Sequence, residues 1–158
     1  MVQATGVGQS TMTPRFAGGG SVEAYLAWQG DESGKSIRVA LSTDNGASWS
    51  PSANVASELF FDQTSSAGWV QGFPSLAVDH SSWGGSEGNI YLVYVARSAG
   101  DTADIAFQRS TDGGRTFTSP VLLNSRPGGD RTQWVPWVTV DNDTGRVHVS
   151  YYDGSADL

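Results

Sequence analysis

The sequence predicts an all-β fold built from repeated antiparallel sheets. Twenty glycines and only two methionines in 158 residues are typical of a chain with many turns and few long helices. No long segment places Leu, Glu and Lys at the three- and four-residue spacing of an amphipathic helix. Instead, short aromatic-rich segments alternate with turn residues, and the length suffices for one domain with a sizeable core.

A unit of about sixty residues recurs along the chain, and its copies begin at Pro14, Pro74 and Pro136. Each proline opens a short first strand, which a turn connects to an aromatic-rich second strand. We expect these second strands at 24–28, 90–94 and 147–151. The first two copies continue into third strands at 37–42 and 105–110 and into fourth strands near 49–55 and 117–123.

Four short antiparallel strands in each repeated unit are the sequence form of a β-propeller blade. We therefore predict one blade at 11–57, a second at 72–124 and the first two strands of a third at 133–153. On this interpretation, residues 1–158 form a single, partial propeller domain of about two and a half blades.

The connection between the third and fourth strands has the same pattern in both complete copies. It reads Ser-Thr-Asp-Asn-Gly-Ala-Ser-Trp at 42–49 and Ser-Thr-Asp-Gly-Gly-Arg-Thr-Phe at 110–117. Glycine supplies the positive φ of a tight turn, and the Asp carboxylate can accept hydrogen bonds from the turn. We assign a structural role to the residues Ser42, Asp44, Gly46, Trp49, Ser110, Asp112, Gly114 and Phe117.

These two segments resemble the Asp-box, Ser/Thr-x-Asp-x-Gly-x-Ser/Thr-aromatic, of the sialidase and bacterial neuraminidase repeat families. The resemblance extends from about residue 14 to residue 153. It implies a sialidase-like propeller and an extracellular or cell-surface location. The N-terminus shows no basic region followed by an apolar stretch, so no signal peptide is visible.

The sequence lacks a complete set of sialidase catalytic residues. Enzymes of the family use three arginines, a tyrosine paired with a glutamate, and an aspartate, and the first arginine lies in Arg-Ile-Pro. The nearest candidate here is Arg15, which follows Pro14 in the reverse order. None of the four glutamates has an evident sequence link to a tyrosine. We therefore assign no catalytic residue and expect a non-enzymatic module.

Other catalytic and metal-binding patterns are weaker still, so no cofactor or metal is expected. The two histidines, His80 and His148, have no metal-ligand spacing. His148 aligns with Tyr25 and Tyr91, which predicts a packed ring. The segment 141–145, Asp-Asn-Asp-Thr-Gly, is similar to a calcium loop but lacks the distal glutamate, and we interpret it as a turn.

The connectivity of a four-stranded meander predicts where a ligand would bind. The Asp-box turns lie at one end of the strands, and the crossovers between sheets lie at the other. Two crossovers are long, at 57–72 and 124–133, and loops on a rigid scaffold commonly carry function. The candidate ligand residues are Asp62, Trp69, Gln71, Asp130, Arg131 and Trp134.

Charge and composition argue against some classes of partner. The formal net charge is −7, and nine Lys and Arg residues are dispersed without a basic run, which disfavours nucleic-acid binding. No apolar run approaches the roughly 20 residues that span a bilayer, so no membrane partner is expected. Cysteine is absent, which excludes disulfides and cysteine-ligated metals.

Three functions remain open at the level of sequence. The first is a propeller segment that acts as a binding or structural module, with glycans as a candidate ligand. The second is part of a glycoside hydrolase whose other blades come from elsewhere, and the third is a fragmentary or engineered scaffold. Because two and a half blades cannot close a ring, we also expect self-association or a complementary propeller fragment as partner.

Overall fold

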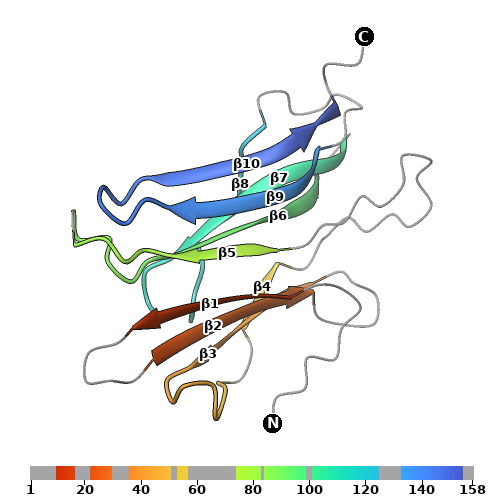
Figure 1. The fold of residues 1–158 in the computed structure, drawn as a ribbon. Helices are drawn as coiled ribbons and strands as arrows, with labels where there is room; N and C mark the ends of the chain where they lie inside the picture. Colours follow the sequence, from red (N-terminus) through yellow and green to blue (C-terminus); the bar gives the residue numbers. More distant parts are fainter. Residues whose placement is uncertain are drawn as a thin grey trace.

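The computed structural model of the chain describes residues 10–16, 22–29, 36–50, 53–56, 74–82, 84–98, 101–124 and 133–154. Within these ranges the chain forms ten β-strands and no α-helix, and every paired strand is antiparallel to its neighbour (Figure 1). The prediction of an all-β, antiparallel fold is confirmed. No helix among the described residues is long and apolar enough to cross a membrane.

The first sheet contains four strands in chain order, β1-β2-β3-β4. Its strands are β1 (Ser10–Phe16), β2 (Val22–Gln29), β3 (Ile37–Ser42) and β4 (Ala53–Ala56). The fourth strand begins four residues after Trp49, so the prediction that it starts near Trp49 is wrong. The carbonyl of Leu41 accepts a hydrogen bond from the backbone N–H of Ser50 at 2.7 Å before the strand proper begins.

The second sheet repeats this order as β5-β6-β7-β8. Its strands are β5 (Ser75–Val78), β6 (Ile90–Ser98), β7 (Asp101–Ser110) and β8 (Val121–Leu122). The third strand is longer than predicted and the fourth is shorter. The remaining strands, β9 (Gln133–Val140) and β10 (Val147–Asp153), form a two-stranded hairpin.

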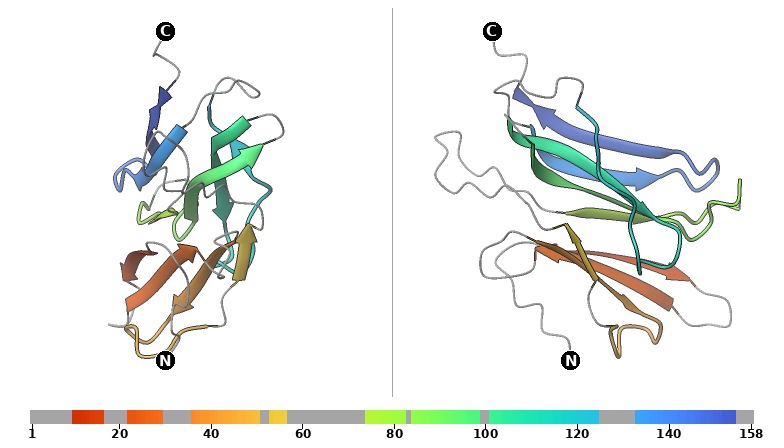
Figure 2. Two further views of the ribbon diagram at one scale, coloured as in Figure 1. Left: turned by 90° about the vertical axis from the view of Figure 1, so that its right-hand side faces the viewer. Right: turned by 180° about the vertical axis from the view of Figure 1, so that it is seen from behind.

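The sheets are stacked face to face, with the second sheet in the middle (Figures 1 and 2). One buried cluster joins the first and second sheets and contains Tyr25, Ala27, Ile37, Val39, Leu76, Val78, Ile90, Leu92, Tyr94 and Ala106. A second cluster joins the other face of the second sheet to the hairpin and contains Ala77, Tyr91, Val93, Val95, Ala103, Ile105 and Val138. The core is therefore divided into two layers.

Strand β6 explains why the middle of the sequence is so apolar. Its residues alternate between the two clusters: Ile90, Leu92 and Tyr94 face the first sheet, whereas Tyr91, Val93 and Val95 face the hairpin. A strand buried on both faces needs apolar side chains at successive positions instead of alternate ones. The run Ile-Tyr-Leu-Val-Tyr-Val satisfies that requirement.

The hairpin leaves its outer face open. Side chains of β9 and β10 that point away from the second sheet are exposed, and Trp137 is 61% exposed. His148 lies on this face and is exposed, so the prediction that it is a packed ring is wrong. The aligned Tyr91 is buried because β9 belongs to the sheet that covers it, whereas no described element covers His148.

Candidate functional site

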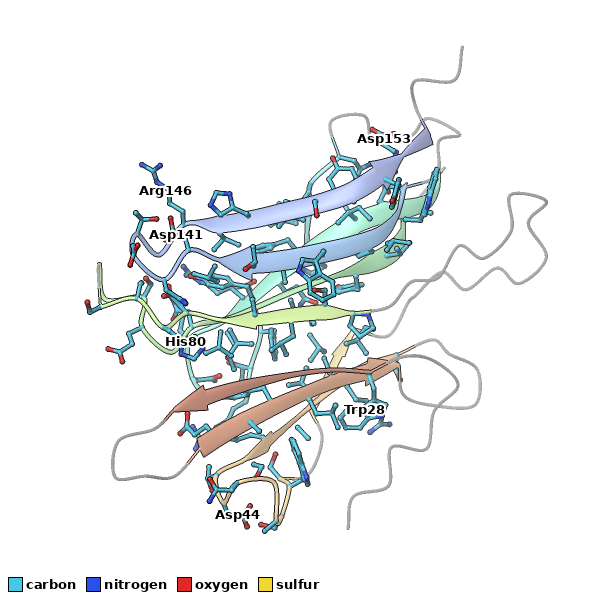
Figure 3. The ribbon with its side chains drawn as sticks, viewed as in Figure 1. Trp28, Asp44, His80, Asp141, Arg146 and Asp153 are labelled. Carbon is cyan, nitrogen blue, oxygen red and sulfur yellow. The ribbon has the colours of Figure 1, made fainter. Side chains whose placement is uncertain are left out.

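Two opposite ends of the strands carry the polar groups of interest. Figure 3 shows Asp44, His80 and Asp141 at the end where the strands of one sheet are joined by turns. Asp153 lies at the opposite end of the hairpin, where β5 and β9, the first strands of the second sheet and of the hairpin, begin (Figure 3). We call these the turn end and the crossover end.

The turn at 42–49, which we call the first Asp-box turn after the motif that it resembles, is held by hydrogen bonds among its own residues. The Ser42 hydroxyl donates to Asp44 Oδ1 at 2.8 Å and accepts the backbone N–H of Gly46 at 2.8 Å. Asp44 Oδ1 accepts the backbone N–H of Ser48 at 2.8 Å, and Oδ2 accepts its hydroxyl at 2.5 Å. Positive φ values of 59° at Asn45 and 84° at Gly46 close the turn.

The second Asp-box turn reproduces the same network. The Ser110 hydroxyl donates to Asp112 Oδ1 at 2.8 Å and accepts the N–H of Gly114 at 2.9 Å. Asp112 accepts the N–H groups of Arg115 and Thr116 at 3.0 and 2.9 Å, and the Thr116 hydroxyl at 2.6 Å. Each aspartate is thus engaged by its own turn, which is a structural use of the carboxylate.

The aromatic residues that end the two motifs are both half-buried. Phe117 packs against the cluster between the first and second sheets. Gly114 is buried beside Ile90: a Cβ at this position would lie 3.3 Å from Ile90 Cδ1. Together, Gly114 and Phe117 anchor the second turn on the core.

Hydrogen bonding lowers the pKa of both Asp-box carboxylates. The Ser48 hydroxyl and N–H, with Ser42, lower the pKa of Asp44 from 3.8 to about 2. The Thr116 hydroxyl and N–H lower the pKa of Asp112 to about 2 as well, against a smaller opposing effect of burial. Unlike the serines at the start of each motif, which are buried, these carboxylates reach solvent.

We expect the two turns to make the fold sensitive to acid between pH 4 and pH 2. A carboxylate whose pKa is lower in the folded chain stabilises it above the unfolded pKa, and the contribution disappears as pH falls through the folded value. The free energy of unfolding, measured by urea titration at several pH values, should fall across this window. In the Asp44→Asn/Asp112→Asn variant the fall should be smaller, and an unchanged pH profile would contradict this account.

A third aspartate, Asp79, is buried at the turn end together with Ser81, and we call these two residues the Asp79 corner. Its Oδ1 accepts the N–H of Ser81 at 2.8 Å and the Ser81 hydroxyl at 2.6 Å. Burial raises the pKa of Asp79, but the hydrogen bonds from Ser81 and Ser86 and the nearby His80 outweigh it, so the net pKa is lowered. Gly145 of the β9–β10 turn packs directly on Asp79 and Ser81.

Asp141 occupies the position in the hairpin that Asp79 occupies in the second sheet. Its Oδ1 accepts the N–H groups of Asp143 and Thr144 at 2.8 and 3.3 Å, and its Oδ2 accepts the Thr144 hydroxyl at 2.8 Å. These bonds fit the interpretation of 141–145 as a turn. Among the described residues, no three His, Asp or Glu side chains are grouped as ligands for a metal ion.

The structure places one tyrosine beside a glutamate, a pairing that the sequence did not reveal. The Tyr25 hydroxyl donates to Glu23 Oε2 at 3.1 Å, two residues away along β2. However, Tyr25 is only 2% exposed, and its ring belongs to the core between the first two sheets. A buried core ring at the turn end does not offer a nucleophile to a substrate, so we assign it no catalytic role.

The crossover end contains polar groups inside otherwise apolar strands. The Asn124 amide donates to buried Asp104 on β7, and Asn124 Oδ1 accepts the N–H of Ile105 at 3.3 Å. Gln133 donates to Asp153 Oδ1 at 3.1 Å. In the described part of the chain, three buried oxygens accept no hydrogen bond: Asp104 Oδ2 and Gln133 Oε1 at this end, and Asp79 Oδ2 at the turn end. Such groups are costly in a core, and two of the three lie at the crossover end, which makes this end the stronger candidate site.

Trp134 is the one predicted ligand residue that the structure describes. It is half-buried and lies in β9, and its ring stacks on Tyr152 with centroids 5.9 Å apart and planes inclined by 9°. Tyr152 is itself 63% exposed. The other predicted ligand residues lie outside the described residues: Asp62, Trp69, Gln71, Asp130 and Arg131.

Sequence reasoning missed the remaining polar and aromatic groups of the crossover end, which are Asp104, Asn124, Gln133, Tyr152 and Asp153. One signal was present, since Asp104 interrupts the apolar run Ala-Asp-Ile-Ala of 103–106. The pairing of Gln133 with Asp153 depends on hairpin register, which local sequence does not reveal. Chemically, the described site offers an exposed aromatic ring beside hydrogen-bonding groups, which suits binding more than bond cleavage.

No protein-family model matches this chain, and a search of curated proteins finds no match either.

Proposed function

We propose that the chain is a sialidase-like, Asp-box β-propeller segment that acts as a binding or structural module with glycans as its ligand class. One observation carries the proposal: two four-stranded meanders follow each other, and the same hydrogen-bonded turn joins the last two strands of each. Repeated sheets of this kind, stacked face to face, are the building units of propellers.

The packing between sheets supports the propeller part of this proposal. Consecutive sheets bury apolar faces against each other, and the first strands of neighbouring sheets approach closely. The backbone N–H of Val138 on β9 donates to the Ser75 hydroxyl on β5 at 3.1 Å. In a propeller the first strand of every blade lies nearest the central axis, where such contacts between neighbouring blades occur.

Glycan binding is favoured by the chemistry of the crossover end. Sugar rings present apolar C–H faces that stack on flat aromatic side chains, and their hydroxyls need hydrogen-bond partners. Tyr152, stacked on Trp134, provides the exposed ring, and Asp153 lies one residue further along β10. By contrast, the Asp-box carboxylates are already engaged within their own turns.

We expect oligosaccharides to perturb the crossover end and not the Asp-box turns. In an NMR titration of the ¹⁵N-labelled chain with glycans selected from an array, the backbone amide shifts of Trp134 and Tyr152 and the indole N–H shift of Trp134 should move. The shifts of Trp49 and Phe117 should stay in place. Tyr152→Ala, at an exposed position, should weaken binding on the order of tenfold, as expected for loss of one stacked ring.

Trp49→Ala at the opposite end is the matched control and should leave the glycan affinity unchanged. Shifts confined to the Asp-box turns would overturn the assignment of the site, and an array without any bound glycan would leave a purely structural role. Release of fluorophore from a fluorogenic sialoside would instead establish a hydrolase.

A further inference from the structure

The first Asp-box turn contains a chemically labile pair of residues. Of the five asparagines in the sequence, only Asn45 is followed by a glycine. Asn45 is exposed at the turn end, in the turn where Figure 3 labels Asp44. Because Gly46 has no Cβ, its backbone nitrogen is open to close approach by the preceding side chain. The pair therefore has the residue types and the exposure that favour deamidation of the asparagine.

The backbone explains why an asparagine occupies this position. The φ angle is 59° at Asn45 and 72° at Gly113, the equivalent residue of the second Asp-box turn. Residues with a Cβ seldom adopt such angles, and asparagine tolerates them better than most. The next position is glycine in both turns, Gly46 and Gly114, again with positive φ. Turn geometry thus favours glycine or asparagine at the first position, and only the first turn has the Asn-Gly pair.

One hydrogen bond holds the nitrogen atom that would have to react. The backbone N–H of Gly46 donates to the Ser42 hydroxyl at 2.8 Å. That hydroxyl belongs to a buried side chain and donates in turn to Asp44 Oδ1 at 2.8 Å. To attack Asn45, the Gly46 nitrogen must lose its proton and leave Ser42, so the bond opposes the reaction. Among the described residues beyond its chain neighbours, no atom lies within 4 Å of the position that a Cβ of Gly46 would take, which leaves this glycine open to water.

We propose that Asn45 is a site of spontaneous deamidation whose rate is set by the hydrogen bond between Gly46 and Ser42. The Gly46 nitrogen loses its proton to hydroxide and attacks Asn45 Cγ, where a new carbon–nitrogen bond forms. The bond from Cγ to the side-chain nitrogen breaks, and ammonia leaves with a proton from water, which regenerates the hydroxide. Water then opens the cyclic imide at either carbonyl and gives aspartate or isoaspartate. The proposal does not depend on glycan binding.

Deamidation makes the two Asp-box turns unequal. Aspartate at position 45 adds a negative charge beside Asp44, whereas isoaspartate routes the main chain through its side-chain carbon and lengthens the backbone. The longer backbone moves Gly46 away from Ser42, whose hydroxyl accepts its N–H. The second turn has Gly113 at the equivalent position, with no side-chain amide to lose. The reaction therefore loosens the first turn and leaves the second unchanged.

Peptide mapping by mass spectrometry tests the site in the full chain, incubated at mildly alkaline pH in buffer and in urea. In urea Asn45 should react on the order of tenfold faster than Asn142, which precedes Asp143, a residue with a Cβ. In buffer the reaction at Asn45 should be slower than in urea on the order of tenfold, because the folded turn holds Gly46. Equal rates at the two asparagines in urea would overturn the site, and equal rates in buffer and urea would overturn its control by the turn.

Hydroxylamine gives an independent readout because it cleaves the cyclic imide. It should produce fragments 1–45 and 46–158 from the unmodified chain. Asn45→Gly is the matched control, since it gives the first turn the residue that the second turn has at this position. This variant should fold and should not be cleaved there. Cleavage of the variant at the same place, or none in the unmodified chain, would refute the assignment.

Ser42→Ala and Ser110→Ala separate the local hydrogen bond from global stability. Both remove the first serine of an Asp-box turn, but Ser42 binds Gly46 whereas Ser110 binds Gly114. In buffer Ser42→Ala should accelerate deamidation of Asn45 on the order of tenfold, and Ser110→Ala should leave the rate unchanged. Equal rates in the two variants would refute control by this bond.

Ser42→Thr keeps a hydroxyl at this position and should restore the slow deamidation of Asn45. Circular dichroism establishes that each variant is folded. If Ser42→Ala does not fold, the rate in Ser42→Thr and the ratio of the rates in buffer and urea decide the question. A rate in folded Ser42→Thr as high as in urea would count against the proposal.

Discussion

Replacing Leu92 with alanine should lower the free energy of unfolding by about 2–5 kcal/mol, the range for a fully buried leucine. Leu92 is 0% exposed in the middle of β6 and belongs to the cluster that joins the first and second sheets. The shortened side chain leaves a cavity between two sheets, and the hydrogen-bonded strands around it have little freedom to collapse into it. Urea unfolding followed by tryptophan fluorescence measures the loss.

Val121→Ala is the control for Leu92→Ala, since Val121 lies on β8 and is 57% exposed. Its free energy of unfolding should change by less than about 0.5 kcal/mol. If the two substitutions had equal effects, the apolar cluster between the first two sheets would not be the core of the fold.

Replacing Gly145 with alanine should destabilise the chain by about 2–4 kcal/mol, a large effect for one added carbon. Gly145 has a φ of 67°, which costs a residue with a Cβ roughly 1 kcal/mol. In addition, a Cβ at Gly145 would lie 2.7 Å from Ser81 Oγ. That hydroxyl cannot move away freely, because Ser81 is buried and donates to Asp79.

Gly84→Ala separates the two causes of this effect. Gly84 also has a positive φ, of 73°, but among the described residues beyond its chain neighbours no atom lies within 4 Å of the position its Cβ would take. The free energy of unfolding of this variant should fall by only roughly 1 kcal/mol, the cost of a positive φ at a residue with a Cβ. Thermal unfolding of both variants gives the comparison. An equally small loss for Gly145→Ala would mean that the hairpin does not pack on the Asp79 corner.

The Asp-box turns and the strand order could be predicted from sequence because their causes are local. Each turn is held by residues within eight positions of one another, so the pattern of residue types was enough to assign Ser110, Asp112 and Gly114 to it. The second strands were equally evident, because burial on both faces demands the uninterrupted apolar run of β6.

The crossover end and the exposed face of the hairpin depend on contacts between residues far apart in the chain. Asp104 meets Asn124, Gln133 meets Asp153, and Trp134 stacks on Tyr152, and each pairing follows from register and not from a local pattern. The same dependence explains the error at His148. Its place in the repeat matches that of the buried Tyr91, but burial requires a neighbouring sheet.

Sequence by itself determined the repeated four-stranded unit and its turns, since hydrogen bonds between nearby residues and side-chain alternation specify them. The tertiary structure alone decided which faces, edges and polar groups are covered, because burial is a property of packed sheets and not of a single strand.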